Sequence, residues 1–165
     1  MLVAAMLPPG KTLFHYDPSK GRLVNHVTLV TEDLERAISF YRDGLGLAVL
    51  SDTLFEGTNP DLWGVHGARR RMVWLGDPAR PDVACVDLIE FQGVRDVVTP
   101  HLRTGPDRFL LAFLVDVDAT VERLRAVGFA GDLRVRHHVG VNVAYVHDPD
   151  GVLIELLDAQ LGPDP

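Results

Sequence analysis

Three polar residues interrupt apolar segments of this chain and have the chemistry of metal ligands: His26, Asp87 and Glu155. His26 begins one apolar segment, and each carboxylate stands inside another. A carboxylate on a buried sheet is costly unless a cation or hydrogen bonds compensate its charge. One imidazole with two carboxylates suits Fe, Mn, Ni, Co or Zn. We therefore predict a metal site at these three residues, with Asp87 or Glu155 also acting as the catalytic base.

The two acids occupy equivalent positions in an approximate internal duplication. The first copy begins with HVTLV at residues 26–30 and closes with DLIE at 87–90. The second begins with LLAFLV at 110–115 and closes with ELLD at 155–158. Each half of such a duplication must bury its apolar face against the other. Taken singly, each acid is explained as well by a solvent-facing strand position and the histidine by a structural hydrogen bond. The repeated arrangement favours one shared site.

Hydrophobic periodicity predicts the same order of elements, β-α-β-β-β, in both halves. In the first module (23–92) we expect a helix that starts at the N-cap Asp33 and stops near Gly44 or Gly46, a loop or irregular strand over 54–67, a strand that starts at 47–50, and strands at 23–30, 71–75 and 83–91. In the second module (109–160) we expect a helix over 119–127 that Gly128 ends, and strands at 109–115, 134–138, 141–146 and 152–157. The predicted fold class is α+β, with two βαβββ modules forming a curved, partly closed mixed β-sheet barrel with helices outside.

Length and composition restrict the classes of function. The chain has 165 residues, enough for one domain, which we place at 23–160 with an N-terminal extension (1–22), an internal linker (93–108) and a tail (161–165). A net charge of −7 argues against nucleic acid and anionic membranes as partners. A single cysteine excludes an internal disulfide and suits the cytoplasm, and the short apolar start is neither a signal core nor a membrane span.

Three segments resemble the vicinal oxygen chelate superfamily, which includes glyoxalase I, extradiol dioxygenases and bleomycin resistance proteins. They are NHVTLV at 25–30, AISFYRDGLGL at 37–47 and DPDGVLIEL at 148–156. In metal-using members of that family the ligands come from the first and last strands of each module. Carried over, the resemblance implies ligands at His26, Asp87 and Glu155, and it also implies a homodimer.

The resemblance predicts a fourth ligand, usually histidine, where this chain has leucine. The position falls on Leu110 if the first strands are matched and on Leu111 if the helix starts are matched. Three outcomes follow. The three remaining residues hold the metal with open positions for water and substrate, another histidine (His66, His137 or His138) takes the place, or the site has become an apolar binding cavity without metal.

Five further residues are predicted to line the substrate pocket: Trp63, Trp74, Cys85, Leu110 and Tyr145. Each has a structural alternative as an ordinary core residue. The run Arg69–Arg71 is able to bind a substrate carboxylate, and its alternative is a solvated strand edge.

We predict a metal-dependent enzyme acting on a small molecule with vicinal oxygens, as a lyase, an isomerase or an oxygenase. Because one histidine with two carboxylates differs from the usual iron-oxygenase set, lyase or isomerase chemistry is favoured. The alternative is a metal-free protein that sequesters a small molecule in the same cavity. Neither the substrate nor the identity of the metal follows from the sequence.

Overall fold

A computed structural model describes residues 24–58, 60–67, 69–80, 85–93, 109–138 and 141–158. These residues fall into two compact units, and residues 43–46 belong with the second. The expected N-terminal extension, the tail and all of the linker except Gly93 lie outside the described residues.

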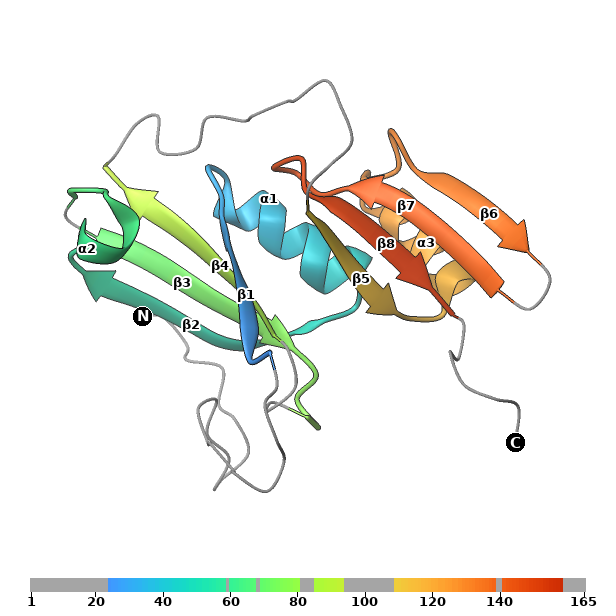
Figure 1. Cartoon of the computed structure of the whole chain (residues 1–165), viewed down its shortest axis with the longest axis horizontal. Coiled ribbons are helices and arrows are strands. Elements are labelled where there is room, and N and C mark those ends of the chain that lie inside the picture. Colours follow the sequence, from blue (N-terminus) through green and yellow to red (C-terminus); the bar gives the residue numbers. More distant parts are fainter. Residues whose placement is uncertain are drawn as a thin grey trace. The chain divides into compact units, whose positions relative to one another are not determined.

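The first unit contains a four-stranded mixed sheet in the order β1-β4-β3-β2, in which β1 and β4 are parallel and the other neighbours antiparallel (Figure 1). Its elements are β1 (His26–Val30), α1 (Leu34–Ile38), a π-helical segment (Ser39–Gly44), β2 (Ala48–Glu56), α2 (Pro60–Trp63), β3 (Arg69–Gly76) and β4 (Cys85–Gln92). The parallel pairing matters for function because it brings the first and last strands of the module side by side.

The second unit repeats this plan with the order β5-β8-β7-β6 and a parallel β5–β8 pair. Its elements are β5 (Leu110–Leu114), α3 (Val117–Ala126), β6 (Arg134–His138), β7 (Val141–His147) and β8 (Leu153–Leu157). The predicted α+β class with two βαβββ modules is therefore confirmed, and each described sheet has four strands.

Each sheet buries one face under its helix. In the first unit, Leu34, Ala37 and Ile38 of α1 are buried, and so are Val73 and Leu88 on the sheet. In the second unit the core residues are Val117, Val121 and Leu124 of α3 with Ala144, Val146, Ile154 and Leu156 of the sheet, all no more than 4% exposed. The opposite face of each sheet is left for the polar residues that the sequence singles out.

The helix ends follow the expected capping chemistry. The Asp33 side chain accepts a hydrogen bond from the Arg36 N–H, which confirms its role as N-cap. Gly128 has a φ of 85°, and Phe129 N–H donates to the Leu124 carbonyl at 2.8 Å, as a helix-ending glycine requires. The predicted helix after Asp33 changes to π-helical geometry at Ser39 instead of continuing as a regular α-helix.

The structure decides one open alternative and corrects one boundary. Residues 54–56, expected in a loop or irregular strand, continue β2, because Leu54 and Phe55 pair with arginines of β3 and Arg69 forms a 3.2 Å ion pair with Glu56. The second helix begins at Val117 instead of residue 119, because Asp116 is its N-cap. None of the described helices has the length and hydropathy needed to cross a membrane.

Candidate functional site

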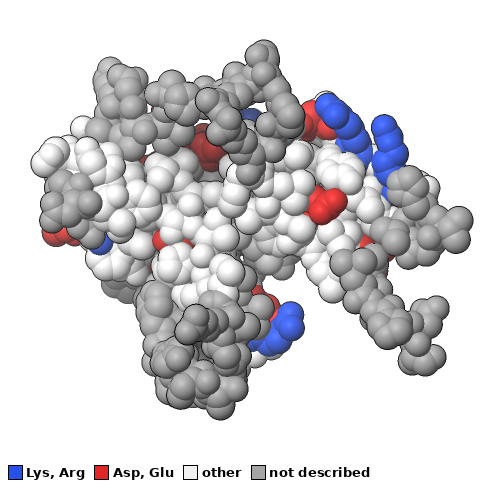
Figure 2. Space-filling view, in the orientation of Figure 1, with Lys and Arg blue, Asp and Glu red and all other residues white. Residues whose placement is uncertain are grey.

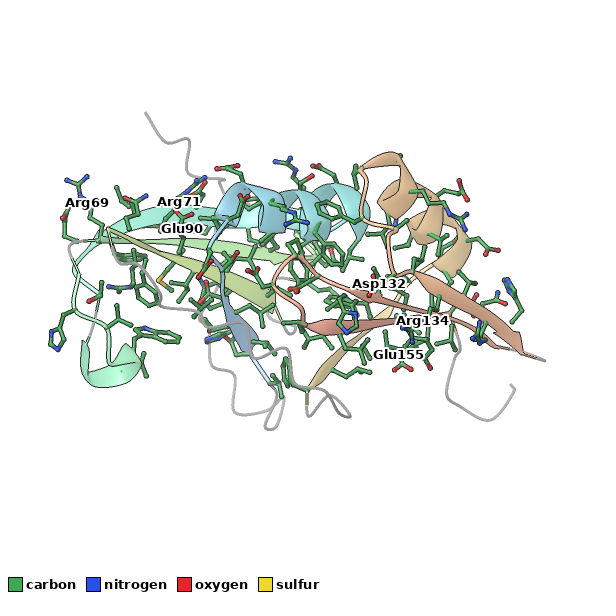
Figure 3. All side chains as sticks on the ribbon, turned by 90° about the horizontal axis from the view of Figure 1, so that it is seen from above. Arg69, Arg71, Glu90, Asp132, Arg134 and Glu155 are labelled. Atoms are coloured by element: carbon green, nitrogen blue, oxygen red, sulfur yellow. The ribbon has the colours of Figure 1, made fainter. Side chains whose placement is uncertain are left out.

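The face of the first sheet that lies away from α1 carries the predicted site residues of this unit. Thr28 of β1 and Trp74 of β3 are the direct neighbours of Asp87 on β4. His26 pairs with Cys85, two residues before Asp87 and therefore on the same face. We call this surface the acid face. Glu90 lies on the other face, where it accepts a hydrogen bond from Leu34 N–H at 3.4 Å, as its position near α1 in Figure 3 shows.

Asp87 is a buried carboxyl group with unused hydrogen-bonding capacity. It is only 1% exposed, and Thr28 Oγ1 donates to its Oδ2 at 3.3 Å. Its Oδ1 has no hydrogen-bond partner among the described residues. Burial raises the pKa of Asp87 to about 7, and the Thr28 hydrogen bond and the positive charge of Arg70 only partly oppose this shift. A buried oxygen without a partner fits a group that awaits a cation or a substrate.

His26 is exposed at the beginning of β1, and two neighbours orient its ring. Its Nδ1 lies 2.9 Å from Asn25 Oδ1, and its ring packs edge-on against Trp74 with a centroid distance of 4.6 Å. An Nδ1–H that donates to this amide oxygen would leave Nε2 available to bind a cation. A ring held by a hydrogen-bonding partner in this way is typical of metal-binding histidines. Asn25 and Thr28 had not been identified as site residues from the sequence.

The second sheet presents Glu155 on the face away from α3, as Figure 3 shows. Its neighbours in the sheet are Ala112 of β5 and Tyr145 of β7. Tyr145 in turn pairs with Arg134 of β6. Burial, together with hydrogen bonding to Glu155, raises the pKa of Tyr145. The expected pocket residue Tyr145 is thus a neighbour of the expected ligand Glu155.

The strand registers settle which leucine stands where the second histidine was expected. In the first sheet His26 pairs with the residue two positions before Asp87. In the second sheet Leu110 pairs with Leu153, two positions before Glu155. Leu110 is therefore the counterpart of His26, and Leu111 lies on the opposite face.

Of the three predicted alternative histidines, His137 is the one with a described side chain in the unit of Glu155. His137 pairs with Asn142, and its Nδ1 lies 2.9 Å from Asn142 Oδ1, on the face opposite Glu155. The side chain of His138 lies outside the described residues, and His66 is exposed after α2 in the first unit.

One histidine that the sequence had not singled out does lie on the face of Glu155. His147 pairs with Leu153, the same residue that Leu110 pairs with from the other side. Its Nδ1 contacts Asp132 Oδ2, so its ring is held by that carboxylate. Among the described residues, no cluster of three or more His, Cys, Asp and Glu side chains is close enough to hold a metal ion.

The other predicted pocket residues of the first unit also lie at the acid face. Trp74 and Cys85 are buried, 6% and 3% exposed, and they pack with Leu50. Trp63 of α2 packs edge-on against Phe91, four residues after Asp87 on the same face, with ring centroids 5.8 Å apart. The structure therefore brings His26, Asp87 and the two tryptophans together in one unit, and Glu155, Leu110 and Tyr145 in the other.

This fold is that of a known class of protein. The chain belongs to the Glyoxalase/Bleomycin resistance protein/Dioxygenase superfamily, whose family model matches residues 23–156. The expected family is thereby confirmed. A similar curated protein is the lactoylglutathione lyase-like protein terB of Aspergillus terreus, which is 26% identical over 151 residues that cover 81% of this chain and 74% of the relative.

Solved structures agree with this fold. A glyoxalase family protein of Bacillus cereus has a TM-score of 0.64 and 20% identity, covering 94% of this chain and 99% of its own. The trypanothione-dependent glyoxalase I of Leishmania major has a TM-score of 0.54 and 26% identity, covering 84% and 87%. A fosfomycin resistance protein of Listeria monocytogenes, solved with Mn(II) and a dihydroxypropylphosphonic acid, has a TM-score of 0.52 and 17% identity, covering 86% and 94%.

The surface charge agrees with the composition. On the described part of the face in Figure 2, charged residues are scattered among uncharged ones. This part of the surface has no extended basic patch of the kind that binds nucleic acid.

Proposed function

We propose that this chain is a metal-dependent enzyme that acts on a small molecule with two neighbouring oxygens, and that His26, Asp87 and Glu155 are the protein ligands. The observation that carries the proposal is the buried Asp87 Oδ1 without a partner among the described residues. A cation compensates such a group directly. The contact between His26 Nδ1 and Asn25 Oδ1, which orients the ring, supports the same assignment.

A divalent cation held there would stabilise negative charge that develops on the substrate oxygens. The protein contributes orientation and proton transfer. Asp87 or Glu155 would act as the catalytic base when not bound to the cation, and Tyr145 is suited to donate a hydrogen bond beside Glu155. Because the ligand set has one histidine and two carboxylates, we favour lyase or isomerase chemistry over oxygenase chemistry.

The similar proteins support a small-molecule substrate. A lactoylglutathione lyase-like protein and a glyoxalase I are among them, and both names refer to glyoxalase-type chemistry. The Mn(II) in the fosfomycin resistance protein is an instance of this fold binding a divalent metal. We further propose that the protein is a cytoplasmic homodimer.

Metal content tests the proposal. Protein purified without chelator and then supplied with Fe, Mn, Ni, Co or Zn should hold about one ion per chain, and His26→Ala, Asp87→Asn and Glu155→Gln should each lower that content. Glu90→Gln is the matched control, because Glu90 lies on β4 but on the opposite face. A wild-type content below about a tenth of an ion per chain with every metal would refute the proposal.

Leu110 supports a second candidate function. A leucine at the place of His26 removes one donor and adds apolar surface, and Leu110 is 40% exposed. The second candidate is a metal-free protein that sequesters an apolar compound. It predicts tight binding of such a compound that persists in excess chelator, whereas the enzyme proposal predicts loss of activity there.

A further inference from the structure

The arginine run at the start of β3 separates into three residues with different surroundings. Arg69 is paired with Glu56. Arg71 donates two hydrogen bonds to Asp52, at 2.8 and 2.6 Å, and a third to Glu35 at 2.6 Å. Arg70 has no carboxylate partner among the described residues. The two outer arginines are therefore neutralised, while the charge of Arg70 remains available.

Arg70 lies on the acid face. Its neighbours across the sheet are Phe55 of β2 and Phe91 of β4, and Phe91 lies four positions after Asp87 on the same strand. The charge of Arg70 also reaches Asp87, because it acts to lower the pKa of that carboxyl group. Arg70 and the buried acid therefore share one surface, and their backbone positions lie about 13 Å apart in the direction of β4.

The guanidinium group of Arg70 is held in place before any ligand arrives. Nη1 donates to the Gly57 carbonyl at 2.7 Å, and the group stacks over the Phe55 ring at 4.7 Å. Arginine presents five N–H donors, so the Gly57 contact uses only part of its capacity. A fixed planar cation with spare donors binds a planar oxyanion at a small entropic cost.

Aromatic rings flank this cation. The Trp63 ring packs edge-on against Phe91, with centroids 5.8 Å apart, and Phe55 is 38% exposed. An apolar or aromatic group of a ligand bound at Arg70 would contact these rings. The acid face thus has a cationic, aromatic end near Arg70 and an acidic end near Asp87.

We propose that Arg70 binds a carboxylate of the substrate and thereby selects elongated anionic molecules. Their apolar part lies along Trp63 and Phe91, and their reactive oxygens extend toward Asp87. This inference rests on the proposed function, because it takes the acid face as the substrate site. It adds a substrate class that the metal ligands do not specify.

Calorimetric titration with two matched probes, 3-phenylpropanoate and its uncharged amide, tests this inference. The wild-type protein in excess chelator should bind the carboxylate about tenfold more tightly than the amide, since a hydrogen bond to a charged group contributes more than a neutral one. Arg70→Gln should abolish that preference. Arg69→Gln, which removes the same charge from the adjacent residue, should keep the preference.

Two further variants keep the test informative if Arg70→Gln folds poorly. Arg70→Lys keeps the charge but loses the planar fork, so it should retain only part of the preference. Trp63→Leu should weaken the carboxylate and the amide equally. Equal affinity for the two probes, no binding of either probe, or an equal loss in Arg69→Gln would overturn the inference. Because the titrations use chelator and no turnover, a protein that fails the metal test can still show the carboxylate preference.

Discussion

Leu110 occupies in the second sheet the register position that His26 occupies in the first. His26 pairs across β1 and β4 with the residue two positions before Asp87. Leu110 pairs across β5 and β8 with the residue two positions before Glu155. A donor group in one module thus corresponds to an aliphatic group in the other. The neighbouring pair repeats the asymmetry, because Thr28, which donates to Asp87, corresponds to Ala112 beside Glu155.

The substitution Leu110→His should therefore create an additional metal ligand. We expect affinity for Zn or Ni to rise by at least about tenfold, because a nitrogen donor would stand on the face of Glu155. Leu110 is 40% exposed, so the change should cost little stability. Leu111→His places the same group on the opposite face and is the control. Competition with a chromogenic chelator gives both affinities, and an equal gain in the two variants would contradict the register argument.

Asp87 should make stability depend on pH in an unusual direction. Its pKa is about 7 in the folded chain, against an ordinary value of 3.8. Between these values the folded state holds a proton that the unfolded state has released. Between the two pKa values the free energy of unfolding should therefore fall as pH rises, by roughly 1.4 kcal/mol per pH unit. The stabilisation from the bound proton is fully present only below the ordinary pKa of Asp87.

The variant Asp87→Asn, which cannot ionise, should remove that decline. In urea unfolding with chelator present, it should be more stable than wild type at about pH 8 and show a flatter pH profile. Asp118→Asn, at an exposed site in the first turn of α3, should leave the profile unchanged. A wild-type profile that rises from about pH 5 to pH 8 would show that Asp87 is ionised throughout.

Arg71 should contribute to the stability of the first unit. It joins β3 to Asp52 of β2 and to Glu35 of α1, and its side chain is only 21% exposed. Arg71→Met would leave Asp52, 15% exposed, without its cation, so we expect a loss of about 2 kcal/mol. Arg69→Met interrupts a more exposed pair and should cost less than about 1 kcal/mol. Denaturant unfolding of the two variants measures the difference, and equal losses would argue against a special role for Arg71.

Gly44 should resist even a single added methyl group. A Cβ at this position would lie 2.7 Å from Leu124 Cδ2, and Leu124 is completely buried in α3. We expect Gly44→Ala to lower stability by about 1–3 kcal/mol. Gly131→Ala is the control, because a Cβ added there would meet no atom within 4 Å beyond its chain neighbours. Thermal unfolding measures both variants, and equal unfolding temperatures would contradict the packing argument.

Much of the fold could be predicted because the determining interactions are local. Asp33 and Gly128 carry helix-end chemistry that is visible in the sequence, and the strand at 153–157 is apolar at four of its five positions. The sequence left residues 54–56 open between a loop and an irregular strand, because their pairing with β3 depends on residues more than ten positions away. The π-helical segment had no recognisable sequence signal.

The sequence indicated which residues to consider for the site, but it did not indicate which residues surround them. His26, Asp87 and Glu155 stand out as polar residues in apolar strands. The choice between Leu110 and Leu111 needed the β5–β8 register, because a shift of one residue reverses the face of a strand. The different surroundings of Arg69, Arg70 and Arg71 depend on residues from three other segments and have no signature in the run itself.

The parallel pairing of β1 with β4 determines when during folding a binding surface comes into existence. Thr28 and Asp87, adjacent in the sheet, are 59 residues apart in the chain. A hairpin of β3 and β4 forms from near neighbours, but β1 joins only after a long loop has closed, and such closures are slow. During synthesis, His26 therefore emerges well before the acid beside which it will lie. A nascent chain carries the donor atoms without the surface that orients them, so selective binding begins only once the last strand of the module has been added.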